Sequence, residues 1–133
     1  MTRFTSPLVA LALLAASPVL AHHNYSAFDR TQQVTIEGTL EELVYANPHV
    51  LMKVRAGSDL YVASWETPRA VSRQANFTAT TFHVGDRIVV TGSRKRDASS
   101  HELALLSEVV RPADGWRWTK AQPQTQTQAS PSK

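Results

Sequence analysis

Histidines carry the most specific chemistry that this sequence offers. His22 and His23 follow a stretch typical of an export leader, so cleavage after Ala21 would make His22 the first residue of the mature chain. An N-terminal histidine can chelate a metal through its α-amino nitrogen and its ring Nδ1, because the amine has a pKa of about 8 and loses its proton readily. His23 would supply a third nitrogen, and His49 a fourth if the N-terminal arm folds back over the corner that contains it.

A ligand set of nitrogens without sulfur indicates which metal to expect. Such sites favour Cu(II), with Ni(II) and Zn(II) weaker, and the sequence contains no cysteine. The hypothesis is therefore a divalent copper site at His22, His23 and His49. The alternative is that two exposed histidines follow a cleavage site and bind no metal.

Aromatic residues suggest a second kind of site. Tyr45, Tyr61 and Trp65 fall in segments with a strand pattern and, together with His49, would line one open face of a β domain. Tyrosine and tryptophan offer a large apolar surface with a polar group at one end. We therefore expect this face to bind a peptide, a glycan or another component of the cell envelope.

Nucleic-acid binding is a third reading, based on the basic run 94–96 with Trp116 and Trp118 nearby. Basic residues that follow phosphates and aromatic rings that stack on bases are typical of single-strand binding. The export leader argues against this reading, and a run of three basic residues is usually a solvated loop. We expect no nucleic-acid partner.

The sequence offers few candidate catalytic residues. Glu41, Asp86, Glu102 and His83 are scattered along the chain, and no spacing typical of a Ser-His-acid triad or of paired carboxylates is visible. Without cysteine there is also no thiolate nucleophile, disulfide or cysteine-ligated metal centre. We expect a binding protein, not an enzyme.

Length and charge limit the architecture to one small domain. The chain has 133 residues and a formal charge of +3, which falls to +2 when Arg3 is removed with the leader. Residues 1–21 combine that arginine with an apolar run from Leu8 to Ala16, a pattern that predicts a signal peptide cleaved after Ala21. The run is shorter than the roughly 20 residues that span a bilayer, so we expect periplasmic release without a stable membrane anchor.

Strand patterns account for most of the mature chain. Residues 34–40 alternate apolar and polar side chains, Gly38 predicts a bulge or bend, and Glu41-Glu42 shifts the alternation. Further strands are predicted at 50–55, 60–66, 87–92 and 101–110, with a short edge strand at 116–118, and Thr67-Pro68 predicts the start of a short helix over 69–74. The residues expected inside are Ile36, Val54, Val62, Val90 and Leu105.

This order of elements predicts an all-β fold, a five-stranded Greek-key barrel of the OB type with one short helix between its third and fourth strands. An open antiparallel sandwich is the alternative. The barrel is expected over residues 34–118, after an N-terminal arm at 22–33 and before a disordered Gln/Thr/Ser/Pro tail at 119–133.

Several short motifs together resemble one family. They are Ala21-His22-His23, Asn47-Pro48-His49, the segment 34–39, Val84-Gly85-Asp86 and Val90-Thr91-Gly92. With them the chain resembles the DUF6152 family, small exported bacterial proteins of unknown function, although Asn24-Tyr25 stands where that family usually has Ser-Phe. The resemblance implies export and a single small β domain, and it implies no mechanism.

Overall fold

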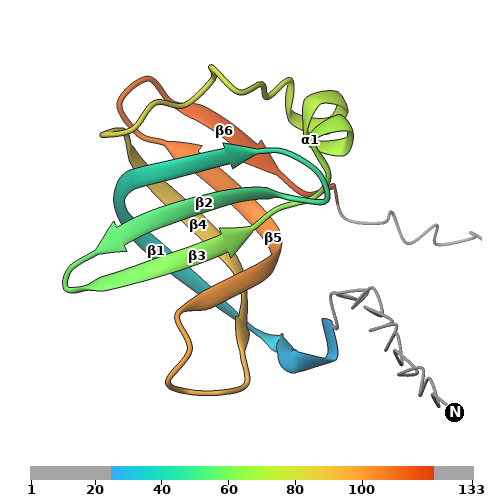
Figure 1. The fold of residues 1–133 in the computed structure, drawn as a ribbon, viewed down its shortest axis with the longest axis vertical. Helices are drawn as coiled ribbons and strands as arrows, with labels where there is room; N and C mark the ends of the chain where they lie inside the picture. Colours follow the sequence, from blue (N-terminus) through green and yellow to red (C-terminus); the bar gives the residue numbers. More distant parts are fainter. Residues whose placement is uncertain (1–24, 122–133) are drawn as a thin grey trace, which may run out of the picture.

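The computed structural model describes residues 25–121, which form a predominantly β domain (Figure 1). The all-β expectation with little helix is confirmed for this part of the chain. Its elements are the 3-10 helix η1 (Tyr25–Ala27), the strands β1 (Phe28–Tyr45), β2 (Val50–Ala56) and β3 (Asp59–Ser64), the helix α1 (Pro68–Ala75), and the strands β4 (Arg87–Lys95), β5 (Glu102–Arg111) and β6 (Trp116–Thr119).

The six strands of the described residues form one sheet in the order β3-β2-β1-β4-β5-β6, with antiparallel neighbours. β3 also pairs with β5 in parallel, through Val62 with Glu102 and Ala63 with Leu103. The sheet thus has one strand more than the five of the predicted barrel, and this strand, β6, lies where the sequence predicted a short edge strand.

β1 is the strand that pairs on both sides. Its first part lies against β4 and its last part against β2, and Thr39 is paired with Arg87 on one side and Arg55 on the other. The predicted shift of alternation is confirmed, since the register with β2 changes between Leu40 and Glu42. After this shift the inward positions of β1 are the odd-numbered ones, and Leu43 and Tyr45 pack against the core there.

Gly38 does not mark the bulge that the sequence predicted, because its register with β4 is regular. The glycine is required for a different reason. A Cβ atom at this position would overlap the carbonyl oxygen of Arg55 in β2. The two strands therefore lie too close together here to leave room for a side chain. A glycine within a strand often permits such a close backbone approach.

The start of β1 was also predicted wrongly. The strand begins at Phe28, which pairs with Lys95, and the ladder continues after an irregularity at Gln33 with Ser93. Residues 28–33 therefore belong to the sheet and not to an N-terminal arm. Their mostly polar side chains carry no alternation, so only the pairing with β4 identifies them as strand.

The helix α1 begins and ends where its sequence predicted. The Thr67 side chain accepts a hydrogen bond from the backbone N–H of Ala70 (3.2 Å), and Pro68 occupies the first turn. Asn76 ends the helix in the left-handed region with φ of 49°. Val71 is the buried anchor of this short helix.

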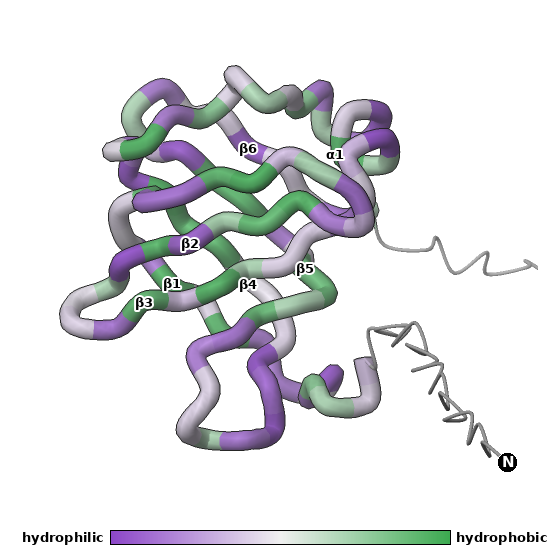
Figure 2. Tube along the Cα trace, viewed as in Figure 1, coloured by the Kyte–Doolittle hydropathy of each residue, from purple (hydrophilic) through white to green (hydrophobic). Residues whose placement is uncertain are grey.

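The core is built from the inward faces of the strands, which Figure 2 shows as alternating hydrophobic positions. Ile36, Val54 and Val90 are buried as predicted. The end of the molecule beside α1 is filled by an aromatic cluster of five rings, those of Trp65, Phe77, Phe82, Trp116 and Trp118.

Two predicted core residues lie elsewhere. On β3 the inward positions are Ala63 and Trp65, so Val62 is only half-buried on the opposite face. Leu105 is half-buried in a bulge of β5 and has a φ of 51°, since the register with β4 shifts between Thr91 and Ser93. A single apolar residue cannot reveal which face of a doubly covered strand it occupies, and a bulge inverts the pattern that follows it.

The close approach at Gly38 makes a direct prediction about stability. Gly38→Ala should lower the free energy of unfolding by about 2 kcal/mol or more, because the new methyl group forces β1 and β2 apart. Urea denaturation measures this loss. The neighbouring exposed residue provides the control: Thr39→Ala adds no atom between the strands and should cost much less. Equal losses in the two variants would contradict the proposed contact.

Candidate ligand-binding site

A hollow of about 370 Å³ lies between the N-terminal end of the described chain and the outward face of β3. We call it the central hollow. Its walls come from η1, the start of β1, β2, β3 and the facing ends of β4 and β5. The principal lining residues are Tyr25, Phe28, Leu51, Val62, Lys95 and Glu102.

The lining of the central hollow follows from strand parity. Leu51 and Val62 point away from the core because Val50 and Met52 on β2, and Ala63 on β3, take the inward positions. The lining is therefore mainly apolar although it lies outside the core. A pocket of this volume with apolar walls and a few polar groups is typical of small-molecule sites.

Hydrogen bonds hold the walls of the hollow in place. The backbone N–H of Arg96 donates to the Ala27 carbonyl (2.8 Å), and Arg96 Nε donates to the Ser26 carbonyl (3.2 Å), which ties η1 to the end of β4. On the other side, Val62 N–H donates to the His101 carbonyl (2.9 Å) where β3 meets β5. Residues 25–27 are thus tied to the domain by these backbone and side-chain bonds.

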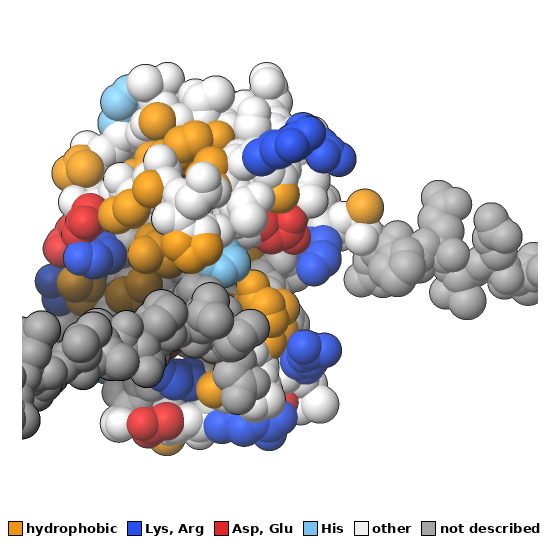
Figure 3. Space-filling model, turned by 45° about the vertical axis from the view of Figure 1, so that its right-hand side comes forward, with side chains coloured by type: hydrophobic (Ala, Val, Ile, Leu, Met, Phe, Trp, Pro, Cys, Tyr) orange, Lys and Arg blue, Asp and Glu red, His pale blue; other side chains and the backbone are white. Residues whose placement is uncertain are grey.

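One ion pair lies in the wall of the hollow. Lys95 Nζ is 3.0 Å from Glu102 Oε1 and 3.2 Å from Oε2, so the two charges neutralise each other. Figure 3 shows hydrophobic side chains gathered on the middle of this side of the molecule, with Lys and Arg side chains at its margin. The central hollow itself therefore offers apolar contact and little net charge.

The aromatic residues predicted to bind a ligand do not form one open face. Tyr45 is half-buried, and its hydroxyl donates to the carbonyls of Pro68 (3.0 Å) and Phe77 (3.1 Å). Trp65 is 2% exposed and packs against Phe77 and Trp118, so the expectation that its ring lies on an outer face is wrong. Tyr61 is half-buried, with its ring 5.0 Å from that of His101.

The physical reason for this outcome is the parity of β3. Tyr61, Ala63 and Trp65 share one face, as predicted, but that face is the one that packs against the core. The other face carries Val62 and Ser64, which line the central hollow. The sequence signal for the hollow was the presence of apolar residues on both faces of β3, because each apolar face of a strand needs something to cover it.

The predicted copper ligands are only partly described. His22 and His23 lie outside the described residues. His49 is half-buried instead of standing on an outer face, and its Nδ1 lies 2.9 Å from the Trp65 carbonyl oxygen. Among residues 25–121, no group of three or more His, Cys, Asp or Glu side chains is arranged to hold a metal ion.

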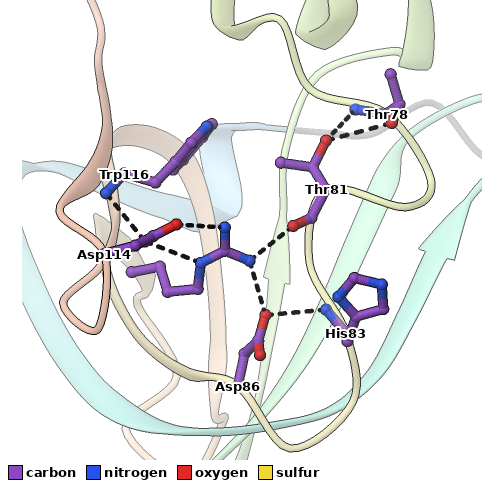
Figure 4. Close-up of polar contacts among 7 residues, drawn as sticks. Thr78, Thr81, His83, Asp86, Asp114 and Trp116 are labelled. Atoms are coloured by element: carbon purple, nitrogen blue, oxygen red, sulfur yellow. Dashed lines mark hydrogen bonds and ion pairs between the residues drawn. The ribbon is translucent and has the colours of Figure 1, made fainter.

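The densest polar cluster surrounds Arg111 at the other end of the molecule (Figure 4). Its guanidinium group donates to Asp86 (3.0 Å), to Asp114 (2.8 Å) and to the Thr81 carbonyl (2.7 Å), and it lies 5.0 Å from the centre of the Phe82 ring. These bonds join the segment before β4 to the turn between β5 and β6. Four of the five guanidinium N–H donors of Arg111 have acceptors within the protein, which is typical of a structural anchor.

The cluster shifts the titration of its acids. The backbone N–H of His83 and the charge of Arg111 lower the pKa of Asp86. The guanidinium and the Trp116 N–H lower the pKa of Asp114, and the two carboxylates raise the pKa of Arg111. Asp86 and His83 lie in the turn before β4, where the His83 backbone N–H donates to Asp86 Oδ2 (2.9 Å) and the Asp86 N–H donates to the His83 carbonyl (3.0 Å).

The Arg111 cluster predicts a pH-dependent contribution to stability. Because the pKa of Asp86 is lower in the folded state, the stabilisation is fully present above the unfolded pKa and is lost as pH falls through the folded pKa. Arg111→Met should cost about 2 kcal/mol at neutral pH, and this cost should shrink below about pH 4. Urea denaturation across pH measures it.

A matched control separates this effect from the loss of any surface arginine. Arg87 is paired with Glu37 at 2.8 Å, but both side chains are at least half exposed, so Arg87→Met should cost much less at every pH. A cost for Arg111→Met that does not change with pH would show that Asp86 and Asp114 contribute no linked titration.

Comparison with known proteins identifies the family of this chain. No curated protein matches it. Among the described residues, no helix is both long and apolar enough to cross a membrane. The model of a family described as a family of unknown function (DUF6152) matches residues 10–104, more than two thirds of the chain. The resemblance seen in the motifs is thereby confirmed, and the chain belongs to the DUF6152 family.

Proposed function

We propose that this protein is an exported binding module that takes a small, mainly apolar ligand of the cell envelope into the central hollow. The observation that carries the proposal is the hollow itself, about 370 Å³ in volume and lined by Phe28, Leu51 and Val62 outside the core. Apolar surface on an outward strand face is costly in water unless something covers it. A ligand would supply that cover.

We also propose that the sheet closes as a barrel of the OB type. The support is the parallel pairing of Val62 with Glu102 and of Ala63 with Leu103, which links the two ends of the order β3-β2-β1-β4-β5. In this proposal β6 extends β5 outside the closed set. Small barrels of this type bind ligands over their second and third strands. The central hollow lies over β2 and β3.

The export part of the proposal rests on residues 1–21, with cleavage after Ala21 and release into the periplasm. This compartment makes a component of the envelope a more suitable ligand than a nucleic acid. We propose a binding role without catalysis, because the walls of the hollow bring together one neutralised ion pair and apolar groups.

An uncharged fluorescent probe tests the binding site. N-phenyl-1-naphthylamine should bind with a saturable rise in fluorescence, because its rings transfer from water into the hollow. Ser64→Trp fills the hollow from β3 and should weaken binding at least about tenfold. Fluorescence titration with circular dichroism as the folding check measures both.

The control places the same bulky residue elsewhere on the sheet. Thr39→Trp lies on the exposed face of β1, outside the lining of the hollow, and should bind the probe like the native protein. If the probe does not saturate, or if the two variants bind it equally, the central hollow is not a ligand site.

A copper site at the mature N-terminus is a second candidate function. It is supported by the chemistry of the sequence, since cleavage after Ala21 creates an amine beside the rings of His22 and His23. His49 Nδ1 already lies at the Trp65 carbonyl, so we assign the ligands chiefly to His22 and His23 and give His49 at most an auxiliary role.

Copper titration decides this second proposal. The mature protein, with its N-terminus verified as His22 by mass spectrometry, should bind one Cu(II), whereas one extra residue before His22 should weaken binding strongly by removing the amine chelate. His49→Ala should weaken it little. Equal binding by the extended and native forms would rule out the N-terminal site.

A further inference from the structure

A second hollow of about 540 Å³ adjoins the central hollow and shares Tyr25 and Phe28 with it. We call it the arginine hollow. Its other lining residues are Ser26, Arg30, Thr31 and Arg96. Two guanidinium groups therefore line this space directly beside an apolar cavity, and none of the described residues in its walls carries a carboxylate.

The two arginines of this hollow differ from several other cations of the described chain in their ion pairing. Among the described residues, Arg30 and Arg96 form no ion pair within 4.0 Å, although six other lysines and arginines do. These six are Lys53, Arg55, Arg87, Lys95, Arg111 and Arg117. Half of the twelve described lysines and arginines are thus neutralised by an ion pair, and the two that line the arginine hollow are not.

Asp29 is the acidic residue closest in sequence, and its oxygen is already used. Its Oδ1 accepts from the Thr31 backbone N–H (2.9 Å) and hydroxyl (2.6 Å). The hydrogen bonds from Thr31, with a smaller contribution from the charge of Arg96, lower the pKa of Asp29, so it is ionised at neutral pH. Asp29 therefore reduces the positive field without occupying the hollow.

The position of Arg96 is fixed by the backbone. Its Nε donates to the Ser26 carbonyl and its N–H to the Ala27 carbonyl, so its side chain lies along η1 at the edge of the hollow. The remaining guanidinium donors can serve a ligand. A planar guanidinium group matches the two oxygens of a carboxylate and binds them more strongly than a neutral donor does.

We infer that the two hollows together bind an amphiphilic carboxylate, a single aliphatic chain with one carboxylate head. The chain would lie against Phe28, Leu51 and Val62 in the central hollow, and the head would lie between Arg30 and Arg96. Lys95 does not compete for the head because Glu102 neutralises it. This inference rests on the proposed function, since it names the class of ligand for the same site.

Charge complementarity is the reason to choose an acid instead of a neutral amphiphile. A neutral head group would leave both guanidinium groups without a negative partner, whereas a carboxylate pairs with them next to an apolar wall that excludes part of the water. Because both arginines are exposed, the gain is modest and sensitive to salt.

Competition between two ligands that differ only in the head group tests the inference. Decanoate and decan-1-ol, each below its aggregation concentration, are titrated against bound N-phenyl-1-naphthylamine. The native protein should release the dye at about tenfold lower concentration of decanoate than of decan-1-ol, and this difference should shrink in high salt.

Variants identify which arginines produce the difference. Arg30→Gln with Arg96→Gln should abolish the preference for decanoate, measured as the ratio of the decan-1-ol and decanoate concentrations that release the dye. Both competitors displace the same dye, so this ratio is not altered if the lost bond from Arg96 to η1 changes the affinity for the dye. Arg30→Gln alone leaves the Arg96 bonds to η1 intact and should reduce the preference for decanoate over decan-1-ol without abolishing it. The control is Arg69→Gln with Arg73→Gln on α1, two exposed arginines that line neither hollow, and it should keep the full preference.

The outcomes separate the two proposals. Equal competition by decanoate and decan-1-ol would overturn the carboxylate inference and leave the apolar site in place. A preference that persists in the double variant at Arg30 and Arg96 would also overturn it. Failure of the native protein to bind the dye at all would overturn the proposed function together with the inference.

Discussion

The close approach of β1 and β2 at Gly38 is the constraint on which the rest of the fold depends. Because no side chain separates them, the carbonyl of Arg55 can lie directly against β1, and the strand can pass from β4 to β2 at Thr39. One long strand then pairs with both halves of the sheet. The halves are thereby brought close enough for β3 to meet β5 at Val62 and Ala63.

The two ends of the domain are built differently. Beside α1, five aromatic rings fill the interior, and Arg111 joins two loops through four hydrogen bonds. At the other end, η1 and the β4 terminus enclose hollows instead of side chains. Tight packing at one end supplies stability, so the other end can carry the apolar surface that lines the central hollow.

The candidate site depends on which face of β3 turns inward. Trp65 and Tyr61 were the natural candidates for contact with a ligand, yet their face packs against the core. Val62 and Ser64, which no motif distinguishes, line the central hollow. In a strand with apolar residues at both parities, the inward face is chosen by the neighbouring strands, and here Ala63 lies inward where β3 meets both β2 and β5.

Local signals in the sequence determined much of this protein. Alternation located most of the strands, Thr67-Pro68 and Asn76 set the limits of α1, and the combined motifs indicated the DUF6152 family. Tertiary structure alone decided that residues 28–33 are strand, that Val62 faces outward, and that Arg30 and Arg96 line one hollow. The first and third features arise from the pairing of β1 with β4, which lie more than 50 residues apart, and the second from the pairing of β3 with β2 and β5. A local pattern of polar and apolar residues does not encode the partner that a strand finds.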